Sequence, residues 1–160
     1  MILKGWTYKL TLESEEPIFD PSWRQITAAL GGIDAAATHA FAVLEFCDGD
    51  YMQAYACAEE YAVEMKSTDT QTGTETQCSA GIPPILAETV NIGTSVKHIT
   101  VLQGEVLTRQ QVLALFRAFH QRQPMPPEFT WRNTLAQLQK LSTNMAEEKS
   151  GRTRRNTARH

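Results

Sequence analysis

Apolar residues alternate with polar ones near the start of the chain and then change to a helical spacing. Residues 3–12 place apolar side chains among polar ones, and Tyr8, Leu10 and Leu12 alternate strictly with polar residues, which predicts a strand with one buried face. Residues 20–32 carry them three and four positions apart, which predicts a helix. Asp20 is expected to cap its first free N–H groups, and Gly31-Gly32 is expected to end it.

Three strand-like segments come next and favour a meander of neighbouring strands. They are residues 41–46, 51–56 and 61–65. Asp48-Gly49 separates the first two and predicts a two-residue hairpin turn, because Asp-Gly tolerates the positive φ that such a turn needs. This turn pairs Leu44 with Gln53, and Glu45 with Met52.

The middle of the chain is less regular. Residues 67–80 are polar and without period, so they predict a long loop. Beyond Pro83-Pro84, residues 85–92 and 96–102 are candidates for two further strands.

A second helix carries the clearest local signal in the chain. Thr108 and Gln111 match a capping box, in which each side chain satisfies the exposed backbone N–H of the other residue. Apolar residues follow at helical spacing, and Pro124 is expected to stop the helix. Residues 135–141 predict a short third helix.

The predicted elements follow the order β-α-β-β-β-β-β-α-α. Strands in a run joined by short turns predict an α+β domain, with a largely antiparallel β-sheet and two to three helices packed on one face. We expect residues 1–142 to form this single domain. Residues 143–160 are polar and then basic, and we expect a disordered tail there.

Composition narrows the class of protein. A length of 160 residues suits one domain with one hydrophobic core. The sequence has no apolar run near the ~20 residues of a membrane span, and its first residues lack the layout of a secretory signal. The three cysteines include no Cys-x-x-Cys pair and indicate no disulfide framework. We therefore expect a cytoplasmic protein without a membrane partner.

The formal net charge of −3 conceals an uneven distribution. Residues 1–106 contain 15 acidic and 5 basic side chains, whereas residues 107–160 contain 3 acidic and 10 basic ones. Blocks of one sign are commonly solvated surface. The other interpretation is an acidic domain that meets a basic partner, since complementary fields accelerate association and select the partner.

The sequence offers little that resembles a catalytic or metal centre. Its four histidines lack the spacing of a helical zinc pair, and no glycine-rich loop opens a helix to hold phosphates. Glu45 and Glu64 are predicted on neighbouring strands, where a carboxylate pair can act as acid and base. Exposed surface is the simpler interpretation of both side chains. We therefore expect no enzyme, no metal and no cofactor.

Two groups of short motifs stand out together. The first comprises Phe19-Asp-Pro-Ser-Trp23, Val43-Leu-Glu45 and Asp48-Gly-Asp-Tyr-Met-Gln53. The second comprises Leu107-Thr-Arg-Gln-Gln-Val112, the helix through Phe116 and Phe119, and Pro127-Glu-Phe-Thr-Trp131. Over residues 6–135 the chain resembles small bacterial immunity proteins of polymorphic and contact-dependent toxin systems, in particular those paired with nucleic-acid deaminase toxins. The resemblance places Trp23 and Trp131 in the core.

The resemblance implies an antitoxin that neutralises a cognate interbacterial toxin by stoichiometric binding, with occlusion of the toxin's active site or substrate groove. A deaminase or nuclease acting on nucleic acid presents a basic cleft, which an acidic domain fits. We expect the contacts near the hairpin, where tyrosines supply anchors for a partner. The expected contact residues are Asp48, Asp50, Tyr51, Tyr55, Glu59 and Glu60.

A second interpretation stays open on the sequence. The chain is then a small non-catalytic regulatory or scaffold module that binds another protein, while its basic tail contacts nucleic acid. The tail lacks the interleaved aromatic residues that stack on bases, so specific nucleic-acid binding is not expected. Deletion of residues 143–160 separates the two interpretations, because an immunity domain neutralises its toxin without them.

Overall fold

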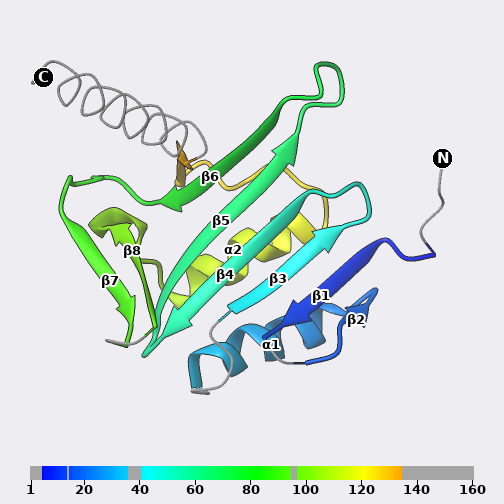
Figure 1. Cartoon of the computed structure of the whole chain (residues 1–160), viewed down its shortest axis with the longest axis horizontal. Helices are drawn as coiled ribbons and strands as arrows, with labels where there is room; N and C mark the ends of the chain where they lie inside the picture. The colour runs from blue at the N-terminus through cyan, green and yellow to red at the C-terminus, as the bar shows by residue number, and fades with distance from the viewer. Residues whose placement is uncertain (1–4, 14, 36–40, 95–96, 135–160) are drawn as a thin grey trace, which may run out of the picture.

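A computed structural model describes residues 5–13, 15–35, 41–94 and 97–134 (Figure 1). Seven strands form one sheet in the order β2-β1-β3-β4-β5-β6-β9, and every neighbouring pair in it is antiparallel. The elements are β1 (Tyr8–Leu12), β2 (Ile18–Phe19), α1 (Trp23–Ala35), β3 (Phe41–Phe46), β4 (Tyr51–Cys57), β5 (Glu60–Thr68), β6 (Glu75–Gly81), β7 (Thr89–Gly93), β8 (His98–Leu102), the 3-10 helix η1 (Gln103–Glu105), α2 (Arg109–His120) and β9 (Thr130–Asn133). The predicted α+β class with a largely antiparallel sheet is confirmed.

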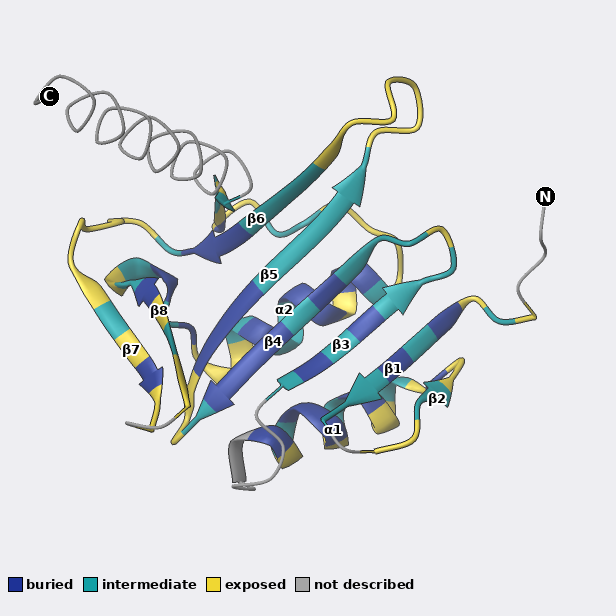
Figure 2. Cartoon of the chain, viewed as in Figure 1, coloured by how far each residue is buried: buried dark blue, intermediate teal, exposed yellow. Residues whose placement is uncertain are grey.

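Both α-helices cover the same face of the large sheet (Figure 1). Successive strand residues point to opposite faces, so Met52 and Ala54 of β4 are buried against the helices while Gln53 between them lies on the other face. Figure 2 shows this alternation along the central strands. Leu30 of α1 and Phe116 of α2, both 0% exposed, pack into the same core.

The opposite face of the sheet is covered in part by the hairpin of β7 and β8. Ile92 and Val101 of the hairpin form a second apolar cluster with Tyr55 and Ala62 of the sheet. The rest of this surface is called the open face below. It carries the half-buried side chains Lys9, Val43, Glu45, Tyr51, Gln53, Glu64, Lys66 and Gln77.

The beginning of α1 differs from the prediction. Ser22 caps the helix, since Gln25 N donates to Ser22 Oγ at 3.2 Å and Ser22 N donates to Gln25 Oε1 at 2.9 Å. The Asp20 carboxylate turns back to β1 instead, where it accepts hydrogen bonds from the backbone N–H groups of Thr7 and Tyr8. The prediction that Asp20 caps the helix was therefore wrong.

The end of α1 also differs from the prediction. The helix continues through Gly31-Gly32 to Ala35. Ile33, 1% exposed, extends the buried stripe of the helix, and its packing outweighs the helical cost of the glycines. The absent side chain of Gly31 also leaves room for Arg109, because a Cβ there would lie 2.7 Å from Arg109 Nη2.

The hairpin between β3 and β4 has another register than predicted. Leu44 pairs with Met52, and Glu45 pairs with Tyr51. The turn holds three residues instead of two, with Gly49 at φ +104° and its N–H donating to Phe46 O at 2.9 Å. Paired residues share a face of the sheet, so this register brings Leu44 and Met52 together in the core.

The prediction of a long loop over residues 67–80 was wrong. β5 runs to Thr68 and β6 begins at Glu75, so most of the segment is an antiparallel pair of strands. Threonine suits strands, and Glu75, Gln77 and Ser79 of β6 point to the open face. Thr76, Cys78 and Ala80 alternate with them and point to the opposite face. A short edge strand, β9, was not predicted and pairs with β6.

Other predictions had mixed outcomes. The Thr108 capping box of α2 is confirmed by the reciprocal hydrogen bonds between Thr108 and Gln111. β7 and β8 confirm both later strands, although β7 begins only at Thr89. Trp23 and Trp131 are half-buried and pack against the core. The predicted third helix at 135–141 and the basic tail lie outside the described residues.

Candidate functional site

The expected contact residues do not form one patch. Asp48, Asp50 and Tyr51 lie at the β3–β4 turn, whereas Glu59 and Glu60 lie at the β4–β5 turn, at the other end of β4. β4 spans seven residues, which places the two groups about 20 Å apart. A single partner contacts both groups only if its footprint runs along the whole strand.

The carboxylates at the β3–β4 turn have local partners. Asp50 N donates to Asp48 Oδ1 at 2.8 Å, and Thr68 N donates to Asp50 Oδ1 at 2.9 Å. Asp48 also lies 3.8 Å from the Arg122 guanidinium, which stacks on the Phe46 ring. Burial and the neighbouring Asp48 charge raise the pKa of Asp50. Both aspartates therefore hold the turn in shape, and Asp48 remains exposed.

The two tyrosines have different environments. Tyr51 is half-buried on the open face, with Lys66 Nζ 5.9 Å from its ring centroid, and burial raises the pKa of its phenol. Tyr55 is 9% exposed beneath the β7–β8 hairpin, and its hydroxyl donates to Lys97 O at 3.3 Å. Of the two rings, Tyr51 is therefore the one that a partner reaches without displacing the hairpin.

Glu59 and Glu60 are both exposed at the β4–β5 turn. Ala58 and Glu59 have positive φ values of 50° and 66° there, so the turn uses a left-handed backbone without glycine. The two carboxylates add negative charge to this end of the sheet.

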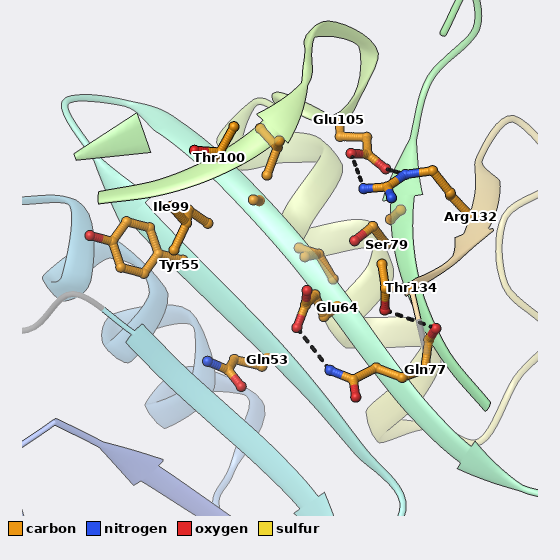
Figure 3. A pocket seen from close by; sticks show the side chains of 14 residues that line it. Gln53, Tyr55, Glu64, Gln77, Ser79, Ile99, Thr100, Glu105, Arg132 and Thr134 are labelled. Carbon is orange, nitrogen blue, oxygen red and sulfur yellow. Dashed lines mark hydrogen bonds and ion pairs between the residues drawn. The ribbon is translucent and has the colours of Figure 1, made fainter. Parts of the chain in front are cut away.

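A pocket of about 300 Å³ lies between the open face and the β7–β8 hairpin (Figure 3). The strands β4, β5, β6 and β9 form one side of it and β8 the other. Its lining residues are Gln53, Tyr55, Ala62, Val63, Glu64, Gln77, Ser79, Ala80, Ile99, Thr100, Val101, Glu105, Arg132 and Thr134. Only Tyr55 among them was expected to contact a partner.

Three polar residues stand in one row across the pocket. Gln53 pairs with Glu64 between β4 and β5, and Glu64 pairs with Ser79 between β5 and β6. Strands are about 4.8 Å apart, so the row spans about 10 Å. Alternation turns all three side chains away from the helices and towards the pocket.

The polar groups of this row are incompletely paired. Glu64 Oε2 accepts a hydrogen bond from Gln77 Nε2 at 3.1 Å, and within the described residues Glu64 has no ion pair. Ser79 is 5% exposed, and neither its hydroxyl nor the Gln53 amide hydrogen-bonds to any described residue. Among the described residues no buried side-chain N or O atom lacks a partner, so the unpaired Ser79 hydroxyl is accessible and can bind a group that enters the pocket.

An ion pair closes the far side of the pocket. Glu105 is 1% exposed, and its carboxylate accepts from Arg132 Nε at 2.9 Å, from Arg132 Nη2 at 2.8 Å and from Leu102 N at 2.9 Å. The hydrogen bonds to Glu105 raise the pKa of Arg132, against an opposing effect of burial. This geometry ties η1 to the edge strand β9.

The carboxylate pair considered for acid–base chemistry is not formed. Glu45 lies on β3 and Glu64 on β5, with β4 between them, so the prediction of neighbouring strands was wrong. Glu45 instead contacts Lys9 Nζ at 3.1 Å. The two carboxylates are two strand spacings apart, about 10 Å, and are also offset along the strands.

The sequence contained only an indirect signal for the pocket. In β6 the polar residues Gln77 and Ser79 alternate with Cys78 and Ala80. This alternation indicates a strand whose polar side lies on an open sheet face. Arg132 follows a proline-rich segment, and nothing local in the sequence links it to Glu105. The antiparallel pairing of β6 with β9 places Arg132 at this edge, and the hydrogen bond from Ile82 N to Gly104 O at 2.8 Å holds η1 beside the end of β6.

Outside the pocket, the described residues show neither a metal site nor a membrane-spanning helix. Among the described residues, no group of three or more His, Cys, Asp and Glu side chains has the arrangement of metal ligands. The same residues include no helix that is long and apolar enough to cross a membrane. No protein-family model matches the chain, and no curated protein matches it either.

Proposed function

We propose that this protein is an immunity protein, which neutralises a cognate toxin by stoichiometric binding through its open face. The observation that carries the proposal is this face, a polar sheet surface on the side away from both helices, with a pocket at one end. The described residues include 16 acidic and 8 basic side chains, a net charge of −8. Such a charge attracts a basic protein surface and speeds its association.

The ion pairs on the open face are partly exposed and can rearrange when a partner binds. Lys9 contacts Glu45 at 3.1 Å and Lys66 contacts Glu75 at 3.3 Å, and all four side chains are partly exposed. Such pairs contribute little to stability, so they rearrange at low cost when a partner binds. Glu64 forms no ion pair with a described residue, although its charge is one of the causes that raise the pKa of Arg132.

The proposed interface runs from the β3–β4 turn to the pocket. Asp48 and Asp50 lie at its outer end, and Tyr51 supplies an aromatic anchor beside them. Tyr55 instead supports the hairpin that forms a pocket wall, and Glu59 and Glu60 contribute long-range attraction from the opposite turn.

The resemblance to immunity proteins suggests that the bound partner is a toxin. A toxin that acts on nucleic acid, such as a deaminase or a nuclease, has a basic cleft for a polyanion. An acidic protein bound over that cleft excludes the nucleic acid. We propose that the encounter takes place in the cytoplasm, where such a toxin reaches its substrate.

Coexpression with the toxin encoded by the adjacent gene tests the proposal. The expected results are survival of cells that produce the toxin and copurification of the two proteins at a one-to-one ratio. If the protein neither protects the cells nor binds the toxin, the proposed function is wrong.

A matched pair of variants tests the use of the open face. Val43→Arg places a bulky cation on the open face outside the pocket, and Gln110→Arg places the same group on an exposed position of α2. We expect protection to be lost with V43R and kept with Q110R. Equal protection by both variants contradicts binding through the open face.

A further inference from the structure

We infer that the pocket receives the guanidinium group of an arginine side chain, bound by the row of Gln53, Glu64 and Ser79. The charge and the hydrogen-bond acceptors of the pocket support the binding of a guanidinium group, whatever molecule carries it. That the arginine belongs to a protein partner rests on the proposed function.

The charge of the pocket favours a cation. Its ionised side chains are Glu64, Glu105 and Arg132. Arg132 and Glu105 are joined by two hydrogen bonds of 2.8 and 2.9 Å, so their charges largely cancel. The three charges sum to −1, and Glu64 is the carboxylate among them that forms no ion pair with a described residue, so it is the one that an entering cation reaches. An anion would meet this carboxylate while the donors of Arg132 that face Glu105 are already engaged.

The acceptors in the pocket match a group with several donors. Glu64 uses Oε2 to bind Gln77, which leaves Oε1 for a ligand. The Ser79 hydroxyl and the Gln53 amide oxygen stand on either side of it and accept no hydrogen bond from a described residue. Guanidinium carries five N–H donors in one plane, whereas the ammonium of lysine is a compact and strongly hydrated charge. A row of acceptors therefore suits arginine better.

The walls of the pocket suit the stem of the same side chain. Ile99 and Val101 of β8 supply an apolar wall opposite the polar row, and Tyr55 lies beside this row on β4. Figure 3 shows Tyr55 and Ile99 near each other. Arginine buries its methylene groups along apolar surface while its head makes polar contacts. A volume of about 300 Å³ is at the small end for ligand pockets and fits one side chain.

A titration of the isolated full-length protein tests the chemistry without a toxin. The probe is Nα-acetyl-L-arginine amide, and Nα-acetyl-L-citrulline amide is its neutral isostere. Binding is followed by NMR at the side-chain amides of Gln53 and Gln77 and at the backbone amide of Ser79. We expect saturable shifts at these groups, with binding of the citrulline compound at least about tenfold weaker. Shifts elsewhere, or equal binding of the neutral compound or of the lysine analogue, overturn the inference.

Matched variants identify the carboxylate responsible. Glu64→Gln removes the charge and keeps the shape, and we expect about tenfold weaker arginine binding. Glu45→Gln removes a charge from the same face outside the pocket and is expected to leave binding within about twofold. Ser79→Ala serves as a second variant, with a loss of severalfold, if E64Q changes the NMR spectrum beyond the pocket. Unchanged binding by E64Q or, in its place, by S79A contradicts the assignment.

The toxin complex tests the source of the arginine. We expect E64Q to weaken toxin binding about tenfold, since it removes the carboxylate that binds the arginine. If the wild-type protein neutralises the toxin and E64Q binds it equally well, the pocket inference is wrong and the proposed function stands. If the probe binds the pocket but the protein does not bind the toxin, the proposed function is wrong and the guanidinium site stands without this partner.

Discussion

Glu105 and Arg132 form a two-point ion pair that fastens the edge strand β9 to the turn before α2. Arg132 Nε donates to Glu105 Oε2 at 2.9 Å, and Arg132 Nη2 donates to Glu105 Oε1 at 2.8 Å. Thr130 Oγ1 adds a hydrogen bond to Gly81 O at 3.2 Å between β9 and β6. The pair therefore fixes one wall of the pocket as well as the edge of the sheet.

Arg132→Met leaves the buried Glu105 carboxylate without its counterion. We expect a loss of about 2–3 kcal/mol in the free energy of unfolding, below the range for a fully buried pair because Arg132 is partly exposed. The double variant Glu105→Leu, Arg132→Met buries no charge and is expected to lose less. Urea unfolding at neutral pH measures both. A single variant that is at least as stable as the double one contradicts the role of the ion pair.

Asp20 makes stability depend on pH. Hydrogen bonds from the backbone N–H groups of Tyr8 and Thr7 hold the pKa of its carboxyl group below the ordinary value of 3.8. A carboxyl group whose pKa is lower in the folded state stabilises the fold above its unfolded pKa and loses this effect as the pH falls through its folded pKa. Asp20→Asn removes the charge and tolerates the local φ of 48°.

We therefore expect D20N to unfold at lower urea concentration than the wild type at pH 7. The gap should narrow as the pH falls below the ordinary pKa of 3.8. Urea midpoints at several pH values measure this gap. A gap that is constant with pH would mean that the two backbone hydrogen bonds do not depend on the carboxylate charge.

We expect alanine substitutions at Gly49 and Gly32 to change the stability of the protein in opposite directions. Gly49 has φ +104° in the β3–β4 turn, so Gly49→Ala should cost about 1–3 kcal/mol. Gly32 is exposed inside α1, and nothing lies within 4 Å of an added Cβ, so Gly32→Ala should stabilise by about 0.5–1 kcal/mol. Thermal unfolding of the two variants measures both effects. Destabilisation by G32A would favour a helix that ends at Gly31-Gly32.

The sequence predicted the features that depend on local pattern. The alternation in β1, the apolar stripes of both helices and the Thr108 capping box all appear in the structure. They were predictable because the signal and the structure that it specifies lie within a few residues.

Features set by tertiary pairing were not predictable in the same way. The register of β3 on β4 depends on burying Leu44 with Met52. The polar segment β6 is a strand because its backbone N–H and C=O groups form hydrogen bonds with the neighbouring strands β5 and β9. The pocket combines residues of five strands and η1, and its row of Gln53, Glu64 and Ser79 exists only in the paired sheet.

The basic tail is expected to be dispensable for toxin binding. Deletion of residues 143–160 removes 5 basic and 2 acidic side chains and leaves the described body intact. We expect toxin affinity within about threefold of the full chain, since the proposed interface consists of residues on the open face of the described body. Isothermal titration of both proteins measures this. Loss of binding on deletion would favour a module that acts through its tail.

The central claim, inhibition by stoichiometric binding, is tested most directly by titrating toxin activity with the purified protein. A fixed amount of the toxin encoded by the adjacent gene is assayed on its nucleic-acid substrate at increasing molar ratios of the two proteins. The account predicts a linear fall in activity that reaches its end at one equivalent, with V43R failing to inhibit and Q110R inhibiting fully. Full toxin activity at a tenfold excess of the wild-type protein, or complete loss at far below one equivalent, would contradict it.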